Sequence, residues 1–168
     1  LWRRAEHALF PAKGKKAFAL MAGPTCPPDE VRRLEEFLNT LQELSWEFSL
    51  CTGRYTLSLP PEFADRGGKW IMEARGIFRS VLTELSDSIA SARQPRDLGP
   101  AIDQALLEWD RWMDWLRPAI REHQTPIETS IKLMGFSSRF RAAMLALRRA
   151  LDQARGLNLR DYMGDVSV

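Results

Sequence analysis

Residues 102–120 read IDQALLEWDRWMDWLRPAI and hold three of the six tryptophans of the chain. Apolar residues recur along this stretch at spacings of four and three, the repeat of one face of an α-helix. Charged residues fall on the opposite face. The apolar face consists of Ile102, Leu106, Trp109, Met113, Leu116 and Ile120. The stretch therefore predicts an amphipathic helix, with Trp109 at the centre of the face that meets a protein core.

Two of these tryptophans lie at the side of that face. Trp112 and Trp115 widen the apolar arc to about half of the helix circumference, more than one neighbouring helix covers. We expect this edge to lie inside a bundle or to contact another molecule. The candidate interaction residues are Trp112, Trp115 and Leu107.

Helical spacing of apolar residues predicts three further long helices. One follows the prolines at 24–28 and carries an apolar stripe from Val31 to Phe48. A second is opened by Gly67 and Gly68 and closed by Gln94-Pro95. The third begins at Thr125-Pro126-Ile127-Glu128, which matches a capping box, and stops at Gly156. Pro118 is expected to bend or end the tryptophan helix near Arg117, because proline lacks the N–H that a helix interior requires.

The short connections between these helices predict an all-α fold, an antiparallel bundle of four main helices. Residues 28–156 form the bundle core of a single domain, 1–168. We expect a short helix or arm at 1–22 and a loosely held tail at 157–168. Alternating apolar and polar residues at 54–59 predict a short extended segment, either a strand or a connector.

Composition places the chain among ordinary globular proteins. It has 168 residues, of which 45% are hydrophobic and 27% charged. No apolar run approaches the roughly 18 residues of a membrane span, so we expect a soluble protein without a membrane partner. The chain begins at Leu1 rather than Met, which is typical of a domain of a longer protein. Cys26 and Cys51 are predicted to be free thiols, and we expect an intracellular location, cytoplasmic or nuclear.

Motifs for catalysis, metals and cofactors are missing from the sequence. His7 and His123 are the only histidines, and neither has the spacing of a zinc or di-iron site. Glu84 and Asp87 match the ExxD half of a magnesium site that needs ExxE on a second helix. No two glutamates in the chain lie three residues apart, so Glu84 and Asp87 are both expected on a solvated face. Gly67-Gly68-Lys69 lacks the other residues of a phosphate loop. We therefore expect no enzyme activity, no metal and no cofactor.

The net charge of +2 hides a segregated distribution of charge. Residues 29–47 carry six acids against two arginines, whereas residues 132–160 carry seven basic residues against one acid. Residues 1–20 are also basic. On the last predicted helix the basic residues share one face with an outward leucine, Leu145; they are Arg141, Arg148, Arg149 and Arg155.

Three interpretations of this arginine face are open. The arginines pair with acids inside the bundle, bind nucleic-acid phosphates, or meet the acidic patch of another subunit. We favour a non-enzymatic protein-interaction or self-assembly module that uses the tryptophan edge and the opposite charge patches. The alternative is a nucleic-acid-binding helical protein, coat-like or regulatory, that binds through the four arginines.

Overall fold

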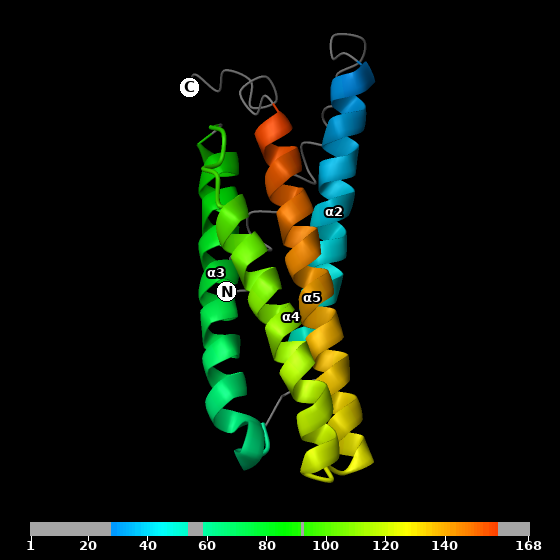
Figure 1. Cartoon of the computed structure of the whole chain (residues 1–168). Helices are drawn as coiled ribbons and strands as arrows, with labels where there is room; N and C mark the ends of the chain where they lie inside the picture. The colour runs from blue at the N-terminus through cyan, green and yellow to red at the C-terminus, as the bar shows by residue number, and fades with distance from the viewer. Residues whose placement is uncertain (1–27, 54–58, 92, 158–168) are drawn as a thin grey trace.

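The computed structural model describes residues 28–53, 59–91 and 93–157 (Figure 1). Within these ranges the chain forms four helices and no strand. They are α2 (Pro28–Gly53), α3 (Pro61–Ala90), α4 (Gly99–Glu122) and α5 (Ile127–Gly156). The predicted all-α fold with four main helices is confirmed. Three predicted segments lie outside the described residues. They are the helix or arm at 1–22, the extended segment at 54–59 apart from Leu59, and the tail beyond Leu157.

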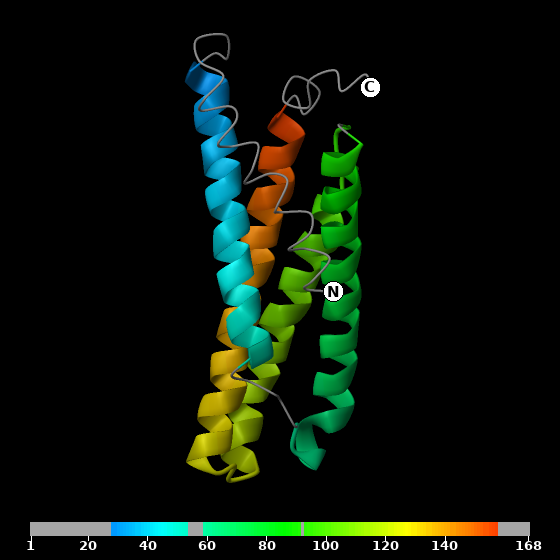
Figure 2. The same ribbon diagram turned by 180° about the vertical axis from the view of Figure 1, so that it is seen from behind.

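The helices lie side by side in the order α2, α5, α4, α3, as the front and back views agree (Figures 1 and 2). Helix α5 packs against each of the other three, whereas α2 packs against α5. The buried face of α5 includes four alanines at helical spacing: Ala143, Ala146, Ala150 and Ala154. Small side chains let helix axes approach closely, so α5 is suited to the central position.

Helix α3 begins earlier than the sequence predicts. Gly67 and Gly68 were expected at its start, but the helix begins at Pro61, and proline is well suited to a first helical position. Gly67 lies inside the helix and is buried. A Cβ atom there would lie 2.7 Å from Cη2 of Trp112 and 3.2 Å from Cδ1 of Leu59. Gly67 therefore makes room for a tryptophan of α4 instead of starting a helix.

We expect Gly67→Ala to lower the free energy of unfolding by about 1–3 kcal/mol, because the rigid indole of Trp112 must shift. Gly76→Ala is the matched control, since a Cβ atom there meets nothing within 4 Å. Alanine is the better helix former, so the control is expected to gain about 0.5–1 kcal/mol. Urea melts measure both changes. Equal stability of the two variants would contradict the close contact of Gly67 with Trp112.

Helices α4 and α5 both run on through residues that the sequence marks as breaks. Helix α4 does not end near Arg117 but continues past Pro118 to Glu122. Pro118 and Asp114 are exposed, so water can solvate the Asp114 carbonyl that proline leaves without a donor. Helix α5 begins at Ile127, one residue after the predicted start, and the predicted capping box is not formed, because Pro126 is the N-cap and no side chain caps the helix. The helix also continues through Gly135, a residue type that weakens helices.

The core face of α4 is turned from the predicted one. Trp109 was expected at its centre but is only partly buried, and its indole N–H donates to the Ser137 carbonyl at 2.9 Å. Trp112 lies in the core instead, with 4% of its surface exposed, and stacks on Trp70 with 5.6 Å between ring centroids. Ala105 and Ala119 are buried on the same side. These small side chains let that side of α4 pack close to the neighbouring helices. The rings of Trp112 and Trp70 fill the core beside them.

Candidate interaction surface

The tryptophan edge predicted as a contact surface is largely covered by the chain itself. Trp112 lies in the core, where its indole N–H donates to Oγ of Ser137 at 3.2 Å. Trp115 is half-buried, and the guanidinium of Arg66 lies 5.0 Å from the centroid of its ring. Leu107 is 46% exposed. Of the three predicted contact residues, Leu107 is thus the one on the surface.

The four predicted arginines of α5 lie against partners within the bundle. Arg149 pairs with Glu43 of α2, and Arg155 pairs with Asp97, which precedes α4, at 3.1 Å. Arg148 lies 3.5 Å from both Asp103 and Asp152, and Arg141 stacks over the ring of Trp109 at 4.9 Å. A fifth arginine, Arg139, pairs with Glu47 of α2 at 3.2 Å. Four of these five arginines therefore have an acid within the chain, as the interpretation of pairing inside the bundle expects, whereas Arg141 contacts an aromatic ring.

Arg148 is the most enclosed of these arginines. A Cβ atom on Gly99 would lie 1.5 Å from its Nη1, so the guanidinium fills the space beside the first residue of α4. Its Nη1 is buried and has no hydrogen-bond partner. The group therefore fastens the start of α4 to α5. A phosphate would compete with the carboxylate of Asp103 for this guanidinium.

Exposed apolar residues lie on the outward side of α5, away from its core face. Ile127 is 77% exposed, Ile131 63% and Leu145 36%. Met134 is half-buried and lies on the same side, since the spacings from 127 to 131 to 134 are four and three. We call these four residues the outer α5 stripe. Of these four residues only Leu145 was predicted to face outward, although the spacings of four and three also place Ile127, Ile131 and Met134 on one side of the helix.

Leu107 of α4 lies beside this stripe. The ion pair of Asp103 with Arg148 sets the antiparallel register of the two helices. One turn further along α4 comes Leu107, and one turn earlier along α5 comes Leu145. Two exposed leucines from neighbouring helices therefore extend the apolar surface onto α4.

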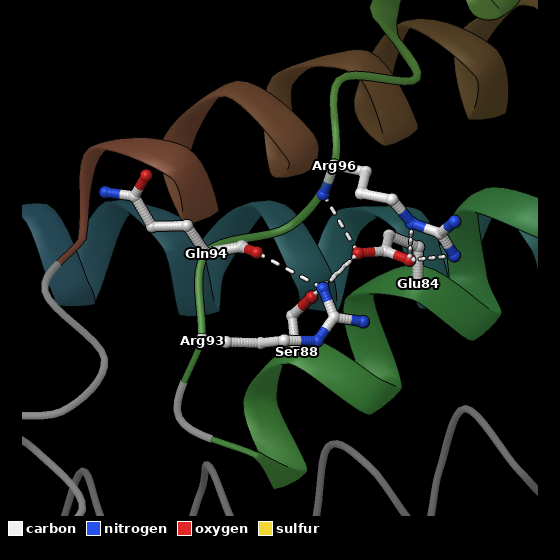
Figure 3. Close-up of polar contacts among 5 residues, drawn as sticks. All are labelled: Glu84, Ser88, Arg93, Gln94 and Arg96. Atoms are coloured by element: carbon white, nitrogen blue, oxygen red, sulfur yellow. Dashed lines mark hydrogen bonds and ion pairs between the residues drawn. The ribbon is translucent and has the colours of Figure 1, made fainter.

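One buried carboxylate lies outside this surface. Glu84 of α3 was expected on a solvated face but is buried. Arg93 donates to its Oε1, Ser88 donates to the same atom at 3.2 Å, and Arg96 donates through its backbone N–H at 2.9 Å and through Nε to Oε2 at 3.0 Å (Figure 3). The hydrogen bond from Arg93 is the main reason that the pKa of Glu84 is lowered to about 2. The carboxylate thus ties the α3–α4 connection to α3.

The position of Glu84 explains why a solvated face was the wrong expectation. It follows the buried Val81 by three residues and precedes the buried Ser88 by four, so it lies on the core side of α3. Its arginine partners come from the connection after the helix. The sequence did contain a signal of this burial, because Glu84 is a charged residue on the apolar face of its helix. A buried carboxylate needs charged partners, and the arginines of the loop after α3 could have been recognised as those partners.

The described part of the chain contains no group of three or more His, Cys, Asp or Glu side chains that could hold a metal ion. None of its helices is long and apolar enough to cross a membrane.

No protein-family model, no curated protein and no solved structure matches this chain.

Proposed function

We propose that the chain is a non-enzymatic protein-interaction module that self-associates, and that its contact surface is the outer α5 stripe together with Leu107. The observation that supports this proposal most directly is the exposure of Ile127 and Ile131, at 77% and 63%. Single exposed apolar residues are ordinary on protein surfaces. Ile127, Ile131 and Met134 follow one another at helical spacing, and Leu145 lies further along the same side beside Leu107, with Ser138 and Arg141 between the two groups.

The surroundings of this surface fit an interface. Ion pairs border it on both sides, with Glu43 and Arg149 toward α2 and Asp103 and Arg148 toward α4. An apolar centre with a polar rim is the usual anatomy of a protein–protein contact. The proposal moves the predicted contact away from Trp112 and Trp115, whose rings are used by the bundle itself, and keeps Leu107.

The nucleic-acid alternative finds less support in these contacts. Four of the basic side chains it requires already lie against acids or an indole ring within the bundle. Binding a phosphate would exchange one anionic partner for another, which lowers the gain from each contact. We therefore treat nucleic-acid binding as an outcome that the experiment below can reveal.

Sedimentation of the purified chain over a range of concentrations tests self-association. We expect Ile131→Asp to weaken association about 10-fold or more, because a charge would enter the apolar centre of the contact. Met72→Asp is the matched control, since Met72 is equally exposed but lies on α3. The control is expected to associate as the unaltered chain does, and both variants should keep its melting temperature.

Three results would contradict the proposal. The first is a chain that stays monomeric at every concentration, and the second is association that Ile131→Asp and Met72→Asp weaken alike. The third is binding of a labelled single-stranded RNA that falls steeply with salt and is lost in Arg148→Glu, which would favour the nucleic-acid alternative.

A further inference from the structure

We infer that the partner of the outer α5 stripe is a second copy of this chain, packed with its α5 antiparallel to the first and with the two-fold axis at Ser138. This inference rests on the proposed function and adds the identity, orientation and register of the partner. It is carried by the positions of Ile131 and Leu145 about Ser138 and by the charges on one flank of the stripe.

One pair of residues in the stripe is placed so that it meets itself across a two-fold axis. Ile131 lies seven residues before Ser138 and Leu145 lies seven residues after it. In an antiparallel pair about Ser138, Ile131 of each copy meets Leu145 of the other, and the contact occurs twice. Ser138 is itself exposed and small, so the two helices can approach closely where they cross.

The outward side of α5 carries both apolar and polar residues. Its positions at spacings of four and three are Ile127, Ile131, Met134, Ser138, Arg141, Leu145, Arg148 and Asp152, and half of them are polar or charged, so the apolar repeat of a coiled coil is not sustained. The core face of α5 already meets α2, α3 and α4, which leaves the outward side available to a helix from outside the chain.

Charges on the flank toward α2 fix the direction of the partner. Arg139 and Arg149 mark this flank, because both pair with glutamates of α2. Glu128 precedes Arg139 by eleven residues, three helical turns, so it lies on the same flank, and it is exposed. A two-fold axis perpendicular to α5 brings the α2 flanks of the two copies together. Glu128 then lies opposite Arg149 of the other copy, ten and eleven residues on either side of Ser138.

A parallel pair would not bring these charges together. Its two-fold axis runs along the helices, so the α2 flank of each copy would face the α4 flank of the other, and Glu128 could not meet Arg149 of the other copy. The antiparallel pair instead makes two attractive contacts related by symmetry. Charge complementarity thus favours a second copy in this orientation.

Two charge-reversed variants of the full chain test this register. Glu128→Arg places arginine against arginine in both contacts of a homodimer, and Arg149→Glu places glutamate against glutamate. We expect each variant alone to dimerise about 10-fold more weakly than the unaltered chain or worse. An equimolar mixture restores both attractive contacts, so we expect heterodimers to form at the unaltered affinity. Native mass spectrometry separates the species by mass, and sedimentation gives the affinities.

Matched variants separate the register from a general effect of charge. Asp65→Arg makes the same reversal on an exposed position of α3 and is expected to leave dimerisation unchanged. Ser138→Tyr is expected to block the crossing, whereas Ser138→Ala keeps it. Arg149→Glu also removes the pair with Glu43, so circular dichroism of each variant at high dilution confirms that the monomer is folded.

The outcomes distinguish this inference from the proposed function. If the unaltered chain dimerises through Ile131 but the mixture gains nothing over the single variants, the antiparallel register is wrong and the contact surface stands. If the unaltered chain is monomeric at every concentration, both fail. Heterodimers in the mixture together with weak homodimers support the inference.

Discussion

Replacing Trp112 with alanine is expected to lower the free energy of unfolding by about 3–5 kcal/mol, the largest effect of any single substitution considered. The indole stacks on Trp70 with 5° between the ring planes, and it contacts the ring of Trp115 at 5.1 Å between centroids. Alanine leaves a cavity among these aromatic rings and removes the donor to Ser137. Urea denaturation followed by far-ultraviolet circular dichroism measures the loss.

Two other tryptophans serve as controls for this result. Trp46→Ala should change stability by no more than about 0.5 kcal/mol, because this side chain is exposed. Trp109→Ala should cost less than Trp112→Ala, since Trp109 is only partly buried. A larger loss from Trp109→Ala would mean that α4 presents the face predicted by its periodicity rather than the face found in the structure.

Periodicity predicts helices well because the repeat of apolar residues reports which sides of a helix avoid water. The four main helices follow from it, including the continuous apolar stripe of α5. The rotation of α4 does not follow, because a wheel with apolar residues over half its circumference leaves the core direction open. The side of α4 that faces the core depends on which small residues meet the neighbouring helices. Ala105 and Ala119 are such residues, but alanine contributes little to the apolar pattern from which the face is predicted.

The start of α3 was missed for a related reason. Gly67 and Gly68 are ordinary signals of a helix end. At Gly67 the glycine is required by a ring from another helix, 45 residues further along the chain, and local sequence does not reveal such a contact. Pro61 at the first turn was the better local signal, and it is consistent with the helix found.

The candidate site could be predicted only in part. Leu107 and Leu145 were predicted to face outward. No such prediction was made for Ile127 and Ile131, because the sequence around them was interpreted only as the start of a helix. The arginine face was recognised, and the acids of α2 were named among its partners. Which acid meets which arginine depends on the register of α2, α4 and α5, and that register is set by packing of the whole bundle.

Neutralising Glu84 is expected to have the second large effect on stability. At pH 7 Glu84→Gln should lower the free energy of unfolding by about 2–3 kcal/mol, because a buried carboxylate with charged hydrogen bonds loses its charge. The amide keeps the shape of the side chain, so the loss reports the interactions with Arg93 and Arg96. Glu73→Gln is the control, an exposed glutamate of the same helix with a distant lysine partner, and it should change stability by no more than about 0.5 kcal/mol.

The pH dependence of this loss separates charge from packing. The pKa of Glu84 is lowered from 4.5 to about 2 in the folded chain. A carboxyl whose pKa is depressed by folding stabilises the folded state fully above its unfolded pKa, so the contribution is complete above pH 4.5 and disappears as the pH falls toward 2. Urea melts at a series of pH values should therefore show the unaltered chain and Glu84→Gln converging between pH 4.5 and 2. A gap between the two that stays constant over this range would mean that Glu84 stabilises the α3–α4 connection by its shape and not by its charge.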